Sequence, residues 1–223
     1  MKKYLGIITD FLKIILDIDL RSVYNIFYKV RKIYYMSRQK AGQRLNKTDF
    51  YPTPPWCYEN LDIDWSMFSS AHEPCRGDGR IQFFLEEEQG IPCTYSEIME
   101  DKDFFDYTDK VDLILTNPPF SLAKEFIDHS ITLSNTCIML LRLNYLGSIT
   151  RHPWWKENTP TALHILSKRP SFTGKGTDAT EYAWFVWDKS DRLDKGVFFA
   201  TLPTKEQNAL AKELAEEVVL ELT

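Results

Sequence analysis

The residues that most clearly suggest chemistry are the tetrad Asn117-Pro118-Pro119-Phe120. This tetrad comes just after the apolar segment 113–115. The two consecutive prolines restrict their own backbone and that of the residue before them. The Asn117 amide and the Pro118 carbonyl can accept hydrogen bonds from an exocyclic amine, and the Phe120 ring can stack on a flat base. The tetrad therefore predicts a site that holds a planar group bearing an amine.

A second polar segment, Glu73-Pro-Cys-Arg-Gly-Asp-Gly79, lies between a short apolar stretch and a helical pattern. Gly77 and Gly79 allow the backbone to approach a ligand closely, and the adjacent helix start offers free N–H groups. The segment lacks the third regular glycine of a dinucleotide-binding turn and the Lys-Ser/Thr of a P-loop, so phosphate binding is not indicated. Taken alone, it is equally compatible with a plain strand-to-helix turn.

For both polar segments to reach a common site, a strand must end immediately before each of them. The hydrophobic pattern predicts strands at residues 68–73, 93–98, 111–116 and 137–143, with helices at 80–89 and 121–133. Ser121 is expected to cap the second helix. Repeated βα units imply a mostly parallel sheet covered on both faces, and the segments 162–166 and 181–187 suit an antiparallel edge because no helix separates them. Ligands of such α/β sheets bind at the carboxyl ends of the strands.

Together, the two segments resemble the S-adenosylmethionine-dependent DNA adenine-N6 methyltransferases of restriction–modification systems and phages. The resemblance covers about residues 49–187 and includes Ser-Leu-Ala-Lys-Glu-Phe126 after the tetrad. The cofactor segment precedes the tetrad, which is the order of the gamma class. The resemblance implies a Rossmann-like α/β methyltransferase fold, S-adenosyl-L-methionine as cofactor and double-stranded DNA as substrate.

The resemblance also implies the cofactor contacts. Residues of an upstream segment would lie beside the methionine part: Tyr51, Thr53 and Pro54. Residues of the glycine segment would line the site: Glu73, Pro74, Gly77, Asp78 and Gly79. Glu97, followed by Ile98, would accept hydrogen bonds from the ribose hydroxyls, and Asp103 and Phe104 would contact the adenine. Asn117 would lie between the cofactor and the acceptor.

By the same resemblance, the tetrad is catalytic. Asn117 and Pro118 would hold the target amine, Pro119 would keep the turn rigid, and Phe120 would stack on the target base. Adenine N6 is a poor nucleophile because its lone pair is delocalised, and hydrogen bonds from N6–H would favour a more tetrahedral nitrogen aimed at the methyl group. The base would have to flip out of the duplex. This chemistry requires no metal.

Two residues depart from the resemblance. Cys75 and Arg76 stand where many relatives carry small residues. Arg76 would either crowd the glycine turn or reach outward to a phosphate, so the departure affects the expected cofactor contacts.

Later polar and aromatic residues are candidates for contact with DNA or the flipped base: Arg142, Arg151, Lys168, Arg169 and Phe172. The alternative is a solvated loop with buried tryptophans. The isolated residues His72, His129 and His164 are interpreted as structural.

Three alternatives to DNA adenine methylation stay open. A glutamine amide in a protein poses the same nucleophilicity problem, although the resembling glutamine methyltransferases usually end the tetrad in Tyr, and Phe120 favours nucleic acid. RNA adenine is a second acceptor that the tetrad does not exclude. The third alternative is a degenerate methyltransferase fold that binds without catalysing.

Charge divides the 223-residue chain unevenly. Residues 1–47 carry eleven Lys or Arg against three Asp, a net +8, whereas the whole chain has a net charge of −5. The acidic remainder argues against nucleic-acid binding through overall charge, so such contacts require local patches. We expect a basic helical extension over residues 1–47, a catalytic domain over 48–202 and an acidic C-terminal helix over 203–223.

The first 35 residues permit three interpretations. Apolar residues recur at helical spacing, which favours a helix that caps the body, but the basic polar positions also suit contact with a membrane surface or nucleic acid. The recognisable motifs all follow Met36, so this segment could also lie outside the working enzyme. Charged residues interrupt the apolar run, which argues against a spanning helix. Four cysteines without a CxxC pair suit a reducing cytoplasm.

Overall fold

The structure is a computed structural model that describes residues 52–172 and 176–221, with side chains described as far as residue 215. The chain divides into two compact units, Met1–Arg44 and Leu45–Thr223, and every described residue belongs to the second. The expected basic extension over residues 1–47 and the expected cofactor residue Tyr51 lie outside the described residues.

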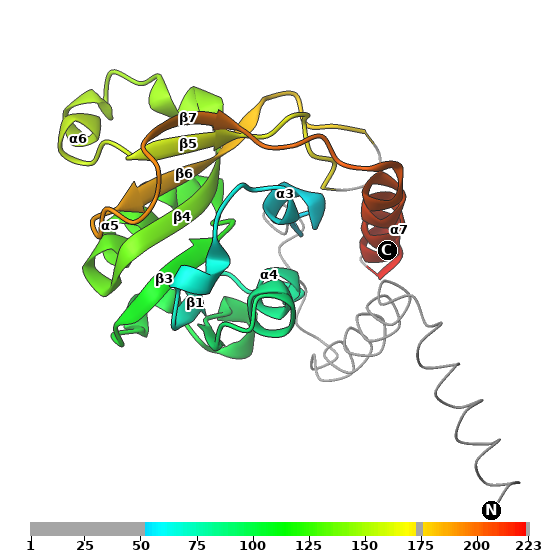
Figure 1. The fold of residues 1–223 in the computed structure, drawn as a ribbon, viewed down its shortest axis with the longest axis horizontal. Coiled ribbons are helices and arrows are strands. Elements are labelled where there is room, and N and C mark those ends of the chain that lie inside the picture. The colour runs from blue at the N-terminus through cyan, green and yellow to red at the C-terminus, as the bar shows by residue number, and fades with distance from the viewer. Residues whose placement is uncertain (1–51, 173–175, 222–223) are drawn as a thin grey trace, which may run out of the picture. The chain divides into compact units, whose positions relative to one another are not determined.

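A seven-stranded sheet forms the centre of the described unit, in the order β2-β1-β3-β4-β6-β5-β7 (Figure 1). The strands are β1 (Ala71–Glu73), β2 (Cys93–Tyr95), β3 (Val111–Thr116), β4 (Ser134–Arg142), β5 (Ala162–Ile165), β6 (Tyr182–Asp188) and β7 (Gly196–Phe199). The neighbours from β2 to β4 pair in parallel, whereas β6 is antiparallel to both β4 and β5. This mostly parallel α/β sheet is a Rossmann-like fold, as the sequence predicted.

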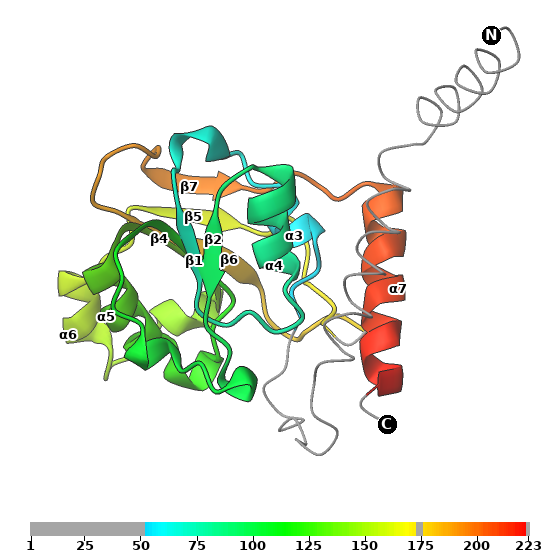
Figure 2. The same ribbon diagram turned by 90° about the horizontal axis from the view of Figure 1, so that it is seen from below.

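Helices cover both faces of the sheet. They are α3 (Trp56–Glu59), α4 (Arg80–Phe83), α5 (Ala123–Leu133), α6 (His152–Glu157) and α7 (Lys205–Glu221). In Figures 1 and 2, α3 and α4 lie on one face, and α5 and α6 lie on the other. Each face therefore has its own apolar core, as expected for parallel strands buried on both sides.

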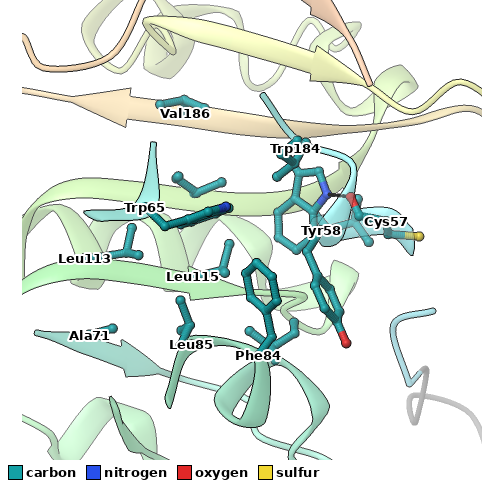
Figure 3. Close-up of a cluster of buried hydrophobic side chains, with 14 of the residues drawn as sticks. Cys57, Tyr58, Trp65, Ala71, Phe84, Leu85, Leu113, Leu115, Trp184 and Val186 are labelled. Atoms are coloured by element: carbon teal, nitrogen blue, oxygen red, sulfur yellow. Dashed lines mark hydrogen bonds between the residues drawn. The ribbon is translucent and has the colours of Figure 1, made fainter. Parts of the chain in front are cut away.

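Alternating residues of the central strands supply these two cores. Leu113 and Leu115 of β3 pack toward α3 and α4, whereas Ile114 packs toward α5. On β6, Trp184 lies on the first side, where its indole N–H donates to the Cys57 carbonyl at 2.7 Å (Figure 3). Phe185 lies on the second side, so the period of two along each strand fixes which residues meet which helices.

Several expected element boundaries change in the structure. The helix expected at 80–89 is present as α4 and a following π-helical turn, Phe84–Glu88. The helix expected at 121–133 begins at Ala123, and Ser121 does not cap it because a 3₁₀ turn, Phe120–Leu122, comes first. Strand β7 was not expected, and it pairs in parallel with β5 beyond the predicted late pair.

Candidate active site

The loops that follow β1, β2 and β3 enclose a pocket of about 310 Å³. Most of the expected cofactor residues line it, namely Thr53, Glu73, Pro74, Gly77, Asp78, Glu97, Ile98, Asp103, Phe104 and Asn117. Pro119 of the tetrad lines it as well. Two polar segments that are about 40 residues apart in sequence therefore meet at one place, because parallel strands bring their carboxyl ends to the same edge.

The glycine segment forms a tight turn between β1 and α4. Gly77 and Gly79 adopt positive φ angles of 54° and 81°, a region that glycine enters without the steric cost that other residues incur. Glu73 precedes the turn, is buried, and accepts a hydrogen bond from the Gln82 N–H in α4 at 2.8 Å. Burial raises the pKa of the Glu73 carboxyl well above its usual range, although the Gln82 N–H opposes the rise.

Glu97 joins the glycine turn to the loop after β2. One carboxylate oxygen accepts from the Gly77 N–H at 2.7 Å, and the other accepts from the Met99 N–H at 3.1 Å. A carboxylate has about four acceptor sites, so each oxygen retains capacity for a further donor. The side chain is thus fixed by backbone contacts and can still accept from a ligand hydroxyl.

Arg76 folds back onto the same two loops. It is buried, pairs with Glu100 at 2.7 Å, and places its guanidinium carbon 4.4 Å from the centre of the Tyr95 ring. Of the two orientations considered from the sequence, an outward reach to a phosphate does not occur here. A Cβ at Gly79 would lie 3.2 Å from Arg76 Nε, so the arginine fills the space that this glycine leaves.

A second arginine connects the glycine turn to the upstream segment. Arg80 binds both carboxylate oxygens of Asp78, with Nε 2.9 Å from each, and donates to the Thr53 carbonyl at 3.3 Å. Arg80 was not expected at the site, because its position inside a helix gave no signal that it faces the loop. It fixes Thr53 relative to the glycine turn.

Thr53 in turn orients the tetrad. The Asn117 side-chain nitrogen donates to Thr53 Oγ1 at 3.1 Å. In this orientation of the amide, the nitrogen faces Thr53 and the acceptor oxygen faces elsewhere. Pro118 is buried, and Phe120 begins the 3₁₀ turn that leads into α5.

An apolar rim surrounds the pocket near the expected adenine contacts. Phe104 is only 2% exposed and packs on the Phe126 ring, 5.1 Å between centres, whereas its neighbour Phe105 is 41% exposed and also lines the pocket. Ile98 and Leu122, which are 65% and 42% exposed, line it too. Phe105 and Leu122 were missed, since the sequence alone does not show which residue of a Phe-Phe pair faces a cavity.

On the other side of the tetrad, Phe120 joins an aromatic and charged cluster. The Arg142 guanidinium lies 4.9 Å from the centre of the Phe120 ring, and the Tyr182 ring lies 5.6 Å away. Phe120, Arg142 and Arg151 also line a second hollow of about 500 Å³ with residues from the start of α5. The expected base-stacking residue therefore lies beside Pro119 and near Leu122, which line the first pocket, and itself lines the second hollow with Arg142 and Arg151.

The remaining residues expected to contact DNA are engaged by the protein itself. Arg151 donates twice to the Tyr145 carbonyl, at 3.1 and 3.0 Å, and Phe172 is buried against Tyr182. Lys168 donates to the Asn208 side chain, and Arg169 pairs with Glu181 at 2.6 Å. Phe172 consequently faces the core in this structure, where it is not placed to press on a base.

The three histidines interpreted as structural make internal contacts. His72 is buried between the hydroxyls of Thr94 and Ser96, 2.8 and 3.0 Å from its ring nitrogens. Burial, assisted by the nearby His129, lowers the pKa of His72 to about 4. His129 contacts the Tyr107 carbonyl at 3.0 Å, and His164 stacks on Phe198.

Metal ligation and membrane insertion find no support in the part of the chain that the structure describes. Within residues 52–172 and 176–221, no three His, Cys, Asp or Glu side chains gather as a metal site would require. The four cysteines are free thiols. None of the described helices combines the length and apolar character needed to span a bilayer.

Comparison with known proteins gives structural neighbours only. No protein-family model and no curated protein matches this sequence. A protein named as a modification subunit of a type I restriction enzyme, from Vibrio vulnificus YJ016, is similar over 84% of this chain and 54% of its own, at 15% identity and a TM-score of 0.48. A component of a type I restriction–modification system is similar over 87% and 53%, at 14% identity and a TM-score of 0.45.

A third neighbour is smaller. It is named as a class I S-adenosylmethionine-dependent methyltransferase from Listeria monocytogenes, and the match covers 88% of this chain and 78% of that one, at 12% identity and a TM-score of 0.45. The chain spans about half of the length of the two restriction–modification neighbours.

Proposed function

We propose that this protein transfers a methyl group from S-adenosylmethionine to the N6 amine of a flipped adenine in DNA. The observation that carries the proposal is the position of Asn117, whose amide nitrogen is held by Thr53 at 3.1 Å while the residue lines the pocket that Glu73, Gly77 and Glu97 also line. An amide oxygen held beside such a pocket can accept a hydrogen bond from an acceptor amine and so help to orient it for methyl transfer.

The residues of the pocket fit the proposed cofactor chemically. Glu97, fixed by two backbone N–H groups, would accept from the ribose hydroxyls. The exposed apolar side chains of Ile98, Phe105 and Leu122 would bury the faces of the adenine ring. Gly77, which lines the pocket, would let the backbone approach the methionine part, near the upstream segment that holds Thr53. Asp103, which lines the same pocket, is expected to make a polar contact with the adenine.

The chemistry is one of positioning. When bound, S-adenosylmethionine supplies a methyl carbon on a cationic sulfur. An amine nitrogen that bonded to that carbon would displace the sulfur as S-adenosylhomocysteine, and the N6 proton would pass to water. Asn117 Oδ1 and the Pro118 carbonyl would accept the two N6–H bonds, which directs the nitrogen lone pair away from them and toward the methyl.

Phe120 would bind the flipped base by stacking. Extrusion from a duplex costs a few kcal/mol of unstacking, and stacking on one aromatic side chain returns about 1–3 kcal/mol. Phe120 lines the hollow that Arg142 and Arg151 also line, so its ring borders a basic, open surface suited to an incoming nucleotide. The rigid Pro118-Pro119 step separates Phe120 from Asn117 by a fixed distance.

The direct test is methyl transfer from tritiated S-adenosylmethionine to unmethylated duplex DNA, followed by digestion and identification of the labelled nucleoside. We expect N6-methyladenine. Label in RNA or in protein glutamine, with none in DNA, would replace the acceptor but retain the chemistry. Cofactor binding with no transfer to any of the three, or no cofactor binding, would contradict the proposal and favour a fold that does not catalyse.

A further inference from the structure

Arg142 ends β4, and its contacts differ from those of a residue poised to bind a phosphate. The guanidinium carbon lies 4.9 Å from the centre of the Phe120 ring and 6.0 Å from that of Tyr182. Both distances lie within the range of a favourable cation–π contact. The charged group of Arg142 therefore packs on the aromatic side chain that the proposed function assigns to the target base.

Two further side chains hold Arg142 in this position. Its Nε donates to the Tyr182 hydroxyl at 3.0 Å, and its Nη2 donates to Asp178 at 3.2 Å. The Tyr182 hydroxyl also donates to the same Asp178 oxygen, at 2.6 Å. Arg142, Asp178 and Tyr182 thus form a closed triangle, in which each side chain contacts the other two.

The ionised states of Asp178 and Arg142 favour the contacts of this triangle. Burial alone would raise the pKa of Asp178, but hydrogen bonds from Tyr182 and the Ala179 N–H, together with Arg142, hold that pKa below its usual range. The Tyr182 hydroxyl raises the pKa of Arg142, mainly by hydrogen bonding. Asp178 consequently stays ionised and Arg142 charged near neutral pH, so the guanidinium is neutralised locally rather than left available to a phosphate.

We propose that Arg142 is a positioning residue that fixes the Phe120 ring for stacking on the acceptor base, with Asp178 and Tyr182 as its supports. The inference rests on the proposed function and extends it to residues that do not touch the reacting atoms. It also changes the role expected of Arg142 from the sequence, which was contact with DNA.

The chain offers a matched control at the other end of the sheet. Arg192 repeats the arrangement, since it lies 4.8 Å from the Phe68 ring centre and pairs with Asp112 at 2.7 Å. Asp112 lies near the start of β3, whereas Asn117 follows the end of that strand. A substitution of Arg192 therefore removes the same kinds of contact away from the site.

The experiment compares Arg142→Met, Arg142→Lys and Asp178→Asn with Arg192→Met, using methyl transfer to unmethylated bacterial genomic DNA. Met keeps much of the apolar stem, and Lys keeps the charge but lacks the planar fork that reaches two partners. We expect kcat to fall about tenfold in all three Arg142 and Asp178 variants, as loss of a cation–π contact and its supports allows. The affinity for S-adenosylmethionine and the kcat of Arg192→Met should remain at the wild-type level.

Salt dependence separates this role from phosphate binding. A phosphate contact would make the slope of log affinity against log salt shallower by about one in Arg142→Met and leave Asp178→Asn unaffected. That result, or unchanged kcat in the Arg142 and Asp178 variants of an active enzyme, would overturn the inference alone. A wild-type protein that does not methylate DNA would overturn the proposed function together with it.

Discussion

Two halves of the candidate site, on either side of Asn117, are built by different means. In the half that would bind the cofactor, backbone N–H groups fix Glu73 and Glu97, and these groups belong to the glycine turn, to α4 and to the loop after β2. In the half that would bind the acceptor, side chains hold one another, as in the contacts of Arg142 with Phe120 and Asp178. The two pocket carboxylates are thus held by backbone groups, whereas the cluster around Phe120 depends on the side chain of every member.

This difference predicts that conservative substitutions will separate the two halves. Changes in the first half should alter cofactor affinity, and changes in the second should alter turnover with DNA. Asn117 and Thr53 lie at the junction of the two halves.

The largest expected effect is that of Asn117→Ala. Removing the amide oxygen should lower kcat by about 10²–10³-fold, the usual cost of losing one oriented catalytic hydrogen-bonding group. The affinity for S-adenosylmethionine, measured by calorimetry, should change little, because the expected ribose and adenine contacts remain. Wild-type turnover in the variant would remove Asn117 from the mechanism.

A second prediction concerns the contribution of His72 to the free energy of unfolding. His72 stacks on Tyr107, and its folded-state pKa of about 4 lies below its ordinary value of 6.5. The unfolded chain therefore binds more protons between these values, so the His72 contribution is present above pH 6.5 and is lost as pH falls toward 4. The loss amounts to at most about 3 kcal/mol.

Urea unfolding of wild type and His72→Gln at several pH values measures this contribution. The difference between their unfolding free energies should shrink by that amount from pH 7 to pH 4. An unchanged difference would mean that His72 is not held neutral by the fold.

Glu97→Gln should sharpen the comparison by acting on the cofactor half alone. The neutral amide has one acceptor oxygen in place of two, so it retains only part of the contacts with Gly77, Met99 and the ribose hydroxyls. We expect the Kd for S-adenosylmethionine to rise about tenfold, as for the loss of one charge-assisted hydrogen bond, with kcat at saturating cofactor nearly unchanged. Glu157→Gln, at an exposed position on α6, serves as the control. A reduced kcat with wild-type affinity for S-adenosylmethionine would contradict the assignment of Glu97 to the half that binds the cofactor.

The smallest effect is expected for Thr53→Val, which removes the hydroxyl that orients Asn117 at similar side-chain volume. Loss of one neutral hydrogen bond corresponds to roughly three- to tenfold in kcat. The double variant Thr53→Val, Asn117→Ala should be no slower than Asn117→Ala alone, since Thr53 acts through Asn117. Additive losses would show that Thr53 has a separate role.

The same division explains how far the sequence predicted the molecule. Glu97 and the glycine turn could be predicted to approach each other because each follows a strand of one parallel sheet. Arg142, Asp178 and Tyr182 could not be grouped, since their contacts join positions 36 and 40 residues apart through an antiparallel pairing whose register the sequence leaves open. Local pattern also left Phe104 and Phe105 undistinguished: both rings contact Phe126 in α5, with centres 5.1 Å apart in each case, and only the packing of the assembled fold buries Phe104.

Strand β7 was missed for a related physical reason. The strand is only four residues long, and its apolar run Val197–Phe199 is too short for periodicity to assign it to a strand; in the structure most of it is exposed. Its pairing with β5 is a property of the assembled sheet.

The central claim is that this site methylates adenine, and its most direct test is the DNA of a host that lacks adenine methylation. The protein and its Asn117→Ala variant would each be expressed in that host, and nucleosides from the digested DNA would be quantified by mass spectrometry. The account predicts N6-methyladenine with the wild-type protein and essentially none with the variant, at equal protein levels. Unmodified adenine in both, with the wild-type protein folded and able to bind S-adenosylmethionine, would contradict it.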